Sequence, residues 1–308
     1  MSAGAWGLVW CFTFVILEAA QAVFFGGLFQ RMDSFLIGSM VFGLTAAGAA
    51  TWTYLRDPKQ IVQAFANRDA LIGINMSAAG GWIAYLVAIQ LIEPAVAFTI
   101  FSGTVPLTAL LAARFGVPEA SSVRNRLEML GNVVLAFGLV VLIAITLAGQ
   151  SGFVRGGVPV AATGIALATL SGALITWMLF YCRRLDRAGV GPVAQLGLRF
   201  LVYIALSLGG VALGLDTKGE APIREIAFAV VFGLLVMAFP IYAMQMAVTL
   251  VSSLTIGAVT ALGPLFVFGF QIMEGRVEYA QATLFGLGIY FIGALTAAIG
   301  SAHAARLS

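Results

Sequence analysis

One acidic residue, Glu18, falls deep within the first long apolar segment of the sequence, which runs from residue 6 to residue 28. A helix would place Glu18 about 18 Å from the start of that segment, near the middle of a hydrocarbon core of about 30 Å. An ionised carboxylate facing lipid there would cost at least ~2.5 kcal/mol, so we expect Glu18 to face a cavity or a partner. If Glu18 faces a cavity, we expect it to bind an amine or to carry a proton. If Glu18 faces a partner, we expect a structural hydrogen bond to a neighbouring helix.

Aromatic and amide side chains recur at helical spacing around this acid. The face of Glu18 also carries Trp10, Phe14, Gln21 and Phe25. Segment 70–92 repeats the pattern with Asn75, Ala78, Trp82 and Tyr85 on one face. A buried indole N–H needs a partner, which a cavity supplies. We therefore predict a substrate cavity whose candidate binding residues are Glu18, Gln21, Asn75, Trp82, Tyr85, Thr99, Ser102, Thr176, Trp177, Tyr242 and Gln245.

Prolines, glycines and one arginine inside the apolar segments have mechanical or topological explanations. Proline removes a backbone hydrogen bond from a helix, so Pro106, Pro240 and Pro264 are candidate hinges. Small residues allow helices to approach closely, which is the role we predict for Gly131, Gly138, Gly286, Gly293 and Gly300. Arg199 is the only base inside a predicted span. We expect its long side chain to extend so that the guanidinium group lies at the cytoplasmic face.

The residues of common cofactor and enzyme sites are missing. His303 is the only histidine, and the two cysteines, Cys11 and Cys182, are far apart. Haem, zinc and histidine-based nucleophilic catalysis therefore have no ligand set or base. No Walker motif is present, so the chain does not itself hydrolyse ATP. We predict no catalytic residues, no metal site and no cofactor.

Composition sets the class of protein. Of 308 residues, 61% are hydrophobic and only 9% are charged, and the mean hydropathy is +1.03. Soluble domains keep roughly a quarter of their residues charged, so this chain cannot cover a water-facing surface. It is predicted to be an all-α integral membrane protein whose partners are the lipid bilayer and a small-molecule substrate. Nucleic acid is excluded as a partner, and we expect a monomer.

Ten apolar segments are each long enough to cross a bilayer. The N-terminus lacks a basic region, so the first is expected to be a retained helix and not a cleaved signal. The predicted spans are 6–28, 35–55, 70–92, 95–115, 128–148, 158–181, 192–215, 226–247, 253–273 and 281–301.

Basic residues predict the orientation of these spans. Counting from the N-terminus, one set of loops holds Arg56, Lys59, Arg68, Arg114, Arg124, Arg126, Arg183, Arg184, Arg187 and Arg306. The opposite set holds only Arg31, Arg155, Lys218, Arg224 and Arg276. The positive-inside rule then places both termini in the cytoplasm, in a membrane of the bacterial inner-membrane type.

The two halves of the sequence resemble each other. AFTIFSGTVPL (97–107) aligns with TIGAVTALGPL (255–265), which matches Pro106 with Pro264. An acid follows each proline, Glu119 in the first half and Glu274 in the second. Five spans per half is an odd number, so the second half must enter the membrane from the other side. We predict two five-helix inverted repeats, residues 1–150 and 151–308. Chance similarity between apolar segments is the alternative.

These motifs resemble the drug/metabolite transporter superfamily, EamA type. The segment WMLFYCRRLDRAG (177–189) is similar to that family's sixth helix, and LRF (198–200) to the opening of its seventh. The resemblance implies two inverted repeats, alternating access and a cavity lined mainly by spans 1, 3, 4, 6, 8 and 9. In the branch that exports aromatic amino acids, Trp177 and Trp82 match aromatic positions of the cavity. Val105 departs from that branch, which often has an aromatic residue before the proline of helix 4.

We therefore expect a secondary transporter that exports small metabolites, mainly aromatic and other neutral amino acids, through a central cavity. The alternative is proton-coupled efflux of hydrophobic cations through Glu18, since aromatic faces also attract cations. An intramembrane enzyme is less favoured, because it would need clustered acids, histidines or cysteines within the spans.

Overall fold

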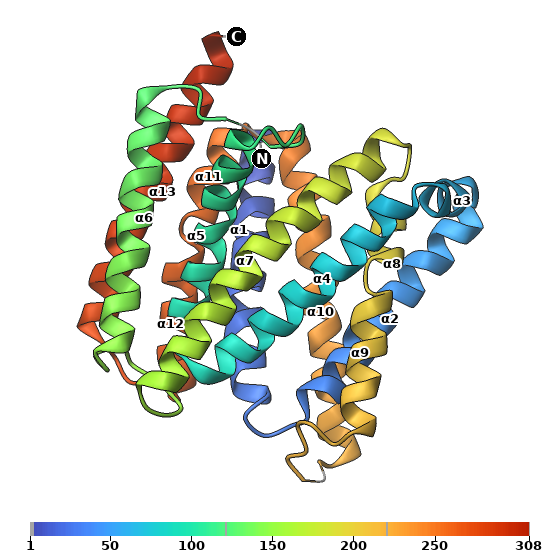
Figure 1. Cartoon of the computed structure of the whole chain (residues 1–308), viewed down its shortest axis with the longest axis horizontal. Coiled ribbons are helices and arrows are strands. Elements are labelled where there is room, and N and C mark those ends of the chain that lie inside the picture. Colours follow the sequence, from blue (N-terminus) through green and yellow to red (C-terminus); the bar gives the residue numbers. More distant parts are fainter. Residues whose placement is uncertain (1–2, 121, 220, 308) are drawn as a thin grey trace.

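The computed structural model describes residues 3–120, 122–219 and 221–307, which form a bundle of helices (Figure 1). Within these residues, ten helical segments are long and apolar enough to cross a membrane, in agreement with the ten predicted apolar segments. The helices are α1 (Ala3–Leu28), α2 (Ser34–Arg56), α3 (Lys59–Ala66), α4 (Arg68–Leu91), α5 (Pro94–Arg114), α6 (Arg126–Leu147), α7 (Val158–Arg187), α8 (Pro192–Leu198), α9 (Leu201–Ala212), α10 (Ile223–Leu250), α11 (Ser253–Thr260), α12 (Gly263–Glu274) and α13 (Gln281–Leu307).

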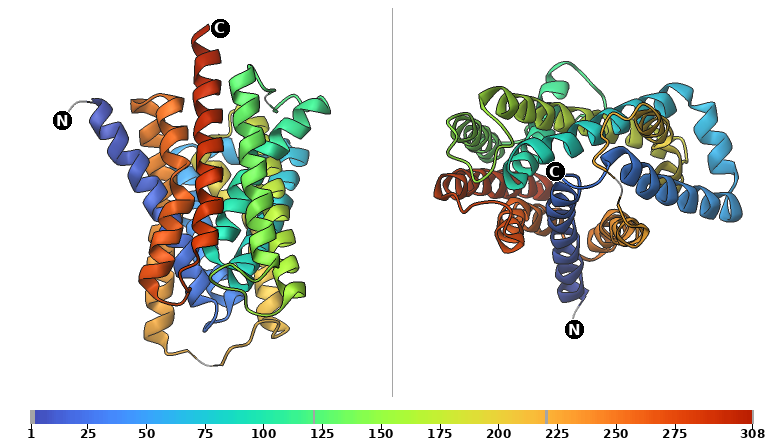
Figure 2. Two further views of the ribbon diagram at one scale, coloured as in Figure 1. Left: turned by 90° about the vertical axis from the view of Figure 1, so that its left-hand side faces the viewer. Right: turned by 90° about the horizontal axis from the view of Figure 1, so that it is seen from below.

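Both termini lie at the same end of the bundle (Figures 1 and 2). We call this the terminal end, and the opposite end the distal end. The loop residues 29–33, 92–93, 148–157, 213–219, 221–222 and 275–280 belong to the distal end. The short helix α3 lies at the terminal end, between α2 and α4.

Two predicted spans are not single helices. The seventh span is divided between α8 and α9 at Arg199 and Phe200, and the ninth between α11 and α12 at Ala261 and Leu262. The first break is tied by Asn75 of α4, whose side-chain amide donates to the carbonyl of Leu198 at 2.8 Å and accepts from the Val202 amide at 3.3 Å. These bonds satisfy backbone groups that the interrupted helix leaves without partners.

The three candidate hinge prolines occupy different settings. Pro264 lies in the first turn of α12, directly after the break in the ninth span. Proline is tolerated in a first turn because the helix needs no backbone donor there. Pro106 and Pro240 lie inside α5 and α10, which continue through them.

The helices pair between the two halves of the chain. The most extensive contacts join α6 with α13, α4 with α7, α1 with α10, α5 with α7, α2 with α8 and α9, and α1 with α12. A smaller contact joins α5 with α12. Small residues make the α6–α13 contact possible. A Cβ atom added to Gly138 would lie 2.7 Å from the Tyr290 amide nitrogen, and one added to Gly293 would meet the backbone of Leu135. The predicted packing role of these glycines is confirmed.

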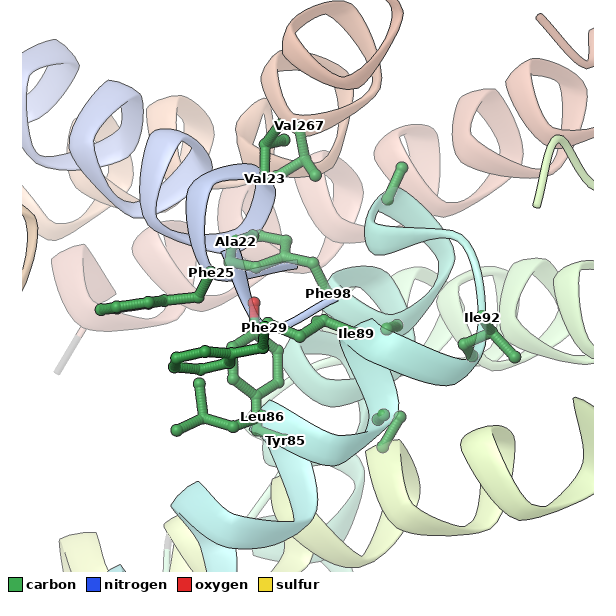
Figure 3. Close-up of a cluster of buried hydrophobic side chains, with 14 of the residues drawn as sticks. Ala22, Val23, Phe25, Phe29, Tyr85, Leu86, Ile89, Ile92, Phe98 and Val267 are labelled. Carbon is green, nitrogen blue, oxygen red and sulfur yellow. The ribbon is translucent and has the colours of Figure 1, made fainter. Parts of the chain in front are cut away.

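A cluster of buried apolar side chains fills the distal half of the bundle between α1, α4 and α5 (Figure 3). Phe25 of α1 and Phe29, the first residue after α1, are stacked with their ring centres 5.0 Å apart, and each is at most 1% exposed. Leu86 and Ile89 of α4 pack in the same cluster. In this cluster, apolar side chains from the distal half of α1 pack directly against those of α4.

Candidate functional site

A cavity of about 270 Å³ lies among α1, α4, α5 and α7, and reaches the break between α8 and α9. Four of the predicted binding residues line it, namely Glu18 and Gln21 from α1 and Trp82 and Tyr85 from α4. The remaining lining residues are Phe14, Gly81, Phe98, Phe101, Ser171, Ile175, Met178, Leu179 and Arg199. The cavity is thus mostly apolar, with a few polar groups that converge on it.

Helical spacing explains how α1 and α4 supply these residues. Phe14, Glu18 and Gln21 recur at intervals of four and three, so they share one face of α1. Trp82 and Tyr85 are three residues apart on α4. Phe25, at the distal end of the α1 face, continues into the buried apolar cluster and does not line the cavity.

The aromatic rings of the site form a continuous series from α2 to α5. The ring centres of Phe42 and Trp82 are 5.2 Å apart, those of Trp82 and Tyr85 6.1 Å, and those of Tyr85 and Phe101 4.9 Å. Such distances are typical of favourable edge-to-face and tilted aromatic pairs. The rings hold one another in place, and the cavity presents a preformed aromatic wall.

Glu18 is a free carboxylate in this wall. The part of the chain that the structure describes contributes no salt bridge and no side-chain hydrogen bond to it. Glu18 also borders a second cavity of about 420 Å³, which it shares with Phe98 and Phe101. The other residues of the second cavity are Ser102, Val105, Pro106, Asn132, Leu135, Gly257, Thr260, Ala261, Tyr290, Ala294, Ala297 and Ala298. The acid is therefore available to a ligand from two sides.

Arg199 does not lie where the sequence led us to expect. It stands at the break between α8 and α9, lines the cavity of Glu18, and has its guanidinium 4.8 Å from the ring centre of Phe200. Its Nε atom is buried and has no hydrogen-bond partner. The Arg199 side chain thus lines the cavity, whereas the sequence analysis expected it to extend toward the cytoplasmic face. The sequence feature that could have identified Arg199 as a cavity residue is its position as the only base within a predicted span.

Several other candidate binding residues use their polar side chains in hydrogen bonds to backbone carbonyls. Asn75 ties the break in the seventh span. Thr99 donates to the carbonyl of Ala95 one turn earlier in α5. Thr176 donates to the Gly172 carbonyl at 2.8 Å and to the Val105 carbonyl of α5 at 3.2 Å. None of these three lines the 270 Å³ cavity, whereas Ser102 lines the second one.

Of the remaining candidate residues, Trp177 and Tyr242 lie outside both cavities, and the side chain of Gln245 is not described. Trp177 packs against Phe180 at 5.5 Å between ring centres. It is one residue before Met178, which lines the cavity, and one residue turns a helix by about 100°. Tyr242 is 49% exposed and meets Trp10 of α1 edge-on. The side chain of Gln245 falls outside the described residues.

Buried hydrogen-bonded clusters at the distal end were not predicted from the sequence. Glu93, between α4 and α5, is fully buried and accepts hydrogen bonds from the Gly152 amide and the Thr283 hydroxyl, both at 2.8 Å. The side-chain amide of Gln271 in α12 also donates to it. Burial raises the pKa of Glu93 despite these bonds. The cluster joins two distal loops to α12 and α13.

A second distal tie involves the loop before α10. Asp216 accepts hydrogen bonds from the backbone amide of Ser34 at 2.9 Å and from the Lys218 ammonium at 2.7 Å. Burial of Asp216 raises its pKa, but the hydrogen bonds from Lys218 and Ser34 outweigh burial and hold the pKa below its usual value. Lys218 also donates to the Phe29 carbonyl. The loop is thereby fastened over the distal end of α1.

At the terminal end, Glu119 holds α7 to the loop after α5. Its carboxylate is buried and lies 3.1 Å from Arg184 and 3.4 Å from Arg187. The hydrogen bond from Arg184 lowers the pKa of Glu119. Glu274, the acid that follows Pro264 in the second half of the chain, contacts Arg276 at 3.4 Å at the distal end.

Comparison with known proteins defines the fold and nothing finer. No protein-family model and no curated protein matches the chain. A solved structure described only as "Crystal structure of protein" shares 19% sequence identity with it, and the match covers 98% of each chain with a TM-score of 0.63. At this identity the similarity concerns the overall fold alone. It supports a full-length bundle of the same arrangement.

Proposed function

We propose that this protein is a secondary transporter that exports neutral amino acids, mainly aromatic ones, by alternating access. The observation that carries the proposal is the cavity of Glu18, Trp82 and Tyr85, which combines a free carboxylate with an aromatic wall in the middle of a membrane bundle. Intramembrane ionisable groups mark substrate or ion pathways by default, because they are costly to keep there. We further propose membership of the drug/metabolite transporter superfamily, on the motifs described above.

Cavity size favours amino acids over larger cations. Pockets for drug-sized ligands occupy about 300–1,000 Å³, and this cavity, at about 270 Å³, is just below that range. A single aromatic amino acid is small enough for such a space. Proton-coupled efflux of hydrophobic cations through Glu18 remains the second candidate, supported by the same carboxylate and the same rings.

The helix pairing supports an inverted repeat. Spans 1 to 10 correspond, in order, to α1, α2, α4, α5, α6, α7, α8–α9, α10, α11–α12 and α13. If span n of the first half corresponds to span n + 5 of the second, the contacting pairs 2–7, 4–9 and 5–10 each map onto themselves. The pair 1–8 then maps onto the pair 3–6. The contact of α5 with α7 (pair 4–6) likewise maps onto the contact of α1 with α12 (pair 1–9). Inverted repeats give transporters two related conformations, in which the site opens to one side and then the other.

The repeated acids follow the same symmetry. Glu119 of the first half holds the end of α7, the sixth span. Glu274 of the second half packs on the end of α1, where a Cβ atom added to Gly27 would overlap its carboxylate. Exchange of the halves converts one contact into the other. Together with the excess of bases in the terminal-end loops, this supports an inner-membrane protein with cytoplasmic termini.

Uptake into liposomes tests the proposal. Purified protein is reconstituted and offered labelled phenylalanine, labelled threonine and a viologen-type cation in separate experiments, with protein-free liposomes as the control. Saturable phenylalanine flux is expected. Flux of the cation alone, dependent on a proton gradient, would favour the second candidate.

A further inference from the structure

Arg199 is a half-buried base that has no anionic partner among the described residues. Guanidinium groups carry five N–H donors and stay charged in proteins. In the described part of the chain, Arg199 makes no salt bridge, and its Nε atom has no hydrogen-bond acceptor. Its neighbours are the ring of Phe200 and the thiol of Cys182, which is only a weak acceptor. A charge removed from water without a partner is costly, so the fold must gain something from it.

The missing anion is not Glu18. Both side chains line the 270 Å³ cavity, yet they form no ion pair, which means that no guanidinium nitrogen of Arg199 lies within 4.0 Å of a carboxylate oxygen of Glu18. They are held on different elements. Glu18 belongs to α1, Arg199 to the break in the seventh span, and α4 packs against both α1 and α9. The cavity thus has a negative and a positive pole that are not in contact with each other.

We infer that Arg199 binds the carboxylate of the transported amino acid, while Glu18 binds its ammonium group. This assignment rests on the function proposed above and deepens it. A zwitterion placed between the poles satisfies both unpaired charges, and bidentate pairing with a carboxylate suits the planar guanidinium. The aromatic wall, with Trp82 and Tyr85, then faces the substrate side chain. The cavity therefore selects molecules that carry both charges.

The same arrangement acts against the alternative substrate class. A hydrophobic cation gains from Glu18 but meets the positive charge of Arg199 in the same small cavity. Like charges in a site of low dielectric repel strongly. Arg199 is thus a specificity-determining residue, since it admits the zwitterion and disfavours the simple cation.

Three ligands of similar shape test the assignment on the parent protein. Phenylalanine carries both charged groups, phenethylamine lacks the carboxylate, and 3-phenylpropionate lacks the ammonium. Competition against labelled phenylalanine in proteoliposomes should show that each analogue binds at least about 10-fold more weakly than phenylalanine, because each leaves one buried pole unpaired. Equal competition by phenethylamine would overturn the role of Arg199 without the need for any variant.

Variants then link the preference to Arg199. Arg199→Gln should raise the half-saturating concentration of phenylalanine by about 10- to 100-fold, while phenethylamine should bind as well as before or better. Arg199→Lys keeps the charge but loses bidentate geometry, so it should retain part of the preference. Arg224→Gln, an exposed base on the first turn of α10, is the matched control and should behave like the parent.

The outcomes separate this inference from the proposed function. If Arg199→Gln stays monodisperse and keeps the parent's ratio of phenylalanine to phenethylamine affinity, the inference fails while amino-acid transport stands. A merely structural role would weaken all three ligands together. If Arg199→Gln does not fold, the ratio in Arg199→Lys decides, and an unchanged ratio there contradicts the inference. If the parent moves no amino acid, the proposed function and the inference both fail.

Discussion

Replacing Glu18 with glutamine distinguishes the two candidate functions. The described residues donate no hydrogen bond to its carboxylate, so Glu18→Gln removes a charge without breaking a contact of the fold. For a zwitterionic substrate, glutamine still offers an oxygen to the ammonium group. A hydrogen bond to a charged group is worth about 1.5–3 kcal/mol, and a neutral one about 0.5–1.5 kcal/mol. The loss of about 1 kcal/mol corresponds to a roughly five-fold higher half-saturating concentration.

The assay is phenylalanine flux into proteoliposomes, measured against substrate concentration for the parent and for Glu18→Gln. An increase of several-fold in the half-saturating concentration, with transport retained, is the expected result. A proton-coupled cation exporter behaves differently, because Glu18 must then exchange a proton for the cation. Complete loss of amino-acid transport in a monodisperse Glu18→Gln protein, with intact pH-driven cation efflux in the parent, would refute the reasoning.

Three further predictions concern the wall, the terminal end and the topology. Trp82→Ala should reduce phenylalanine transport far more than Trp177→Ala in flux assays on monodisperse protein, because only Trp82 lines the cavity; equal effects would contradict the placement. Glu119 has a lowered pKa, so its contribution to stability is present above the usual pKa of a glutamic acid and is lost as the pH falls through the lowered value. The thermal stability of the parent should therefore exceed that of Glu119→Gln at pH 7, and the difference should vanish in acid. Cysteines introduced at Arg155 and His303 should label from opposite sides of the membrane, and labelling from one side would end the ten-span topology.

The spans could be predicted from the sequence because hydropathy alone determines them. Each predicted segment overlaps one membrane-length helical segment of the structure, with boundaries that shift by a few residues. The breaks in the seventh and ninth spans were not predictable in this way. Asn75 stabilises the first of them from α4, more than a hundred residues earlier in the chain, and no local pattern near Arg199 reports that contact.

The site was predictable where helical periodicity was unambiguous. The spacing of Glu18 and Gln21, and of Trp82 and Tyr85, fixed two faces that do meet at one cavity. Periodicity cannot say how a helix is rotated about its own axis, so Trp177 was placed on the cavity side although Met178 faces the cavity instead. The sequence also gave no means to tell a threonine that faces a cavity from one that bonds its own helix, as Thr99 does.

A counterflow experiment tests the central claim most directly. Proteoliposomes are loaded with unlabelled phenylalanine and diluted into a trace of labelled phenylalanine, with no ion gradient present. A carrier that alternates access through the cavity of Glu18 and Trp82 should accumulate label inside above its outside concentration and then release it as the internal pool runs down. Protein-free liposomes and liposomes loaded with the viologen-type cation should not accumulate it. Equilibration of the label without a transient excess, or accumulation only in the cation-loaded vesicles, would contradict the account.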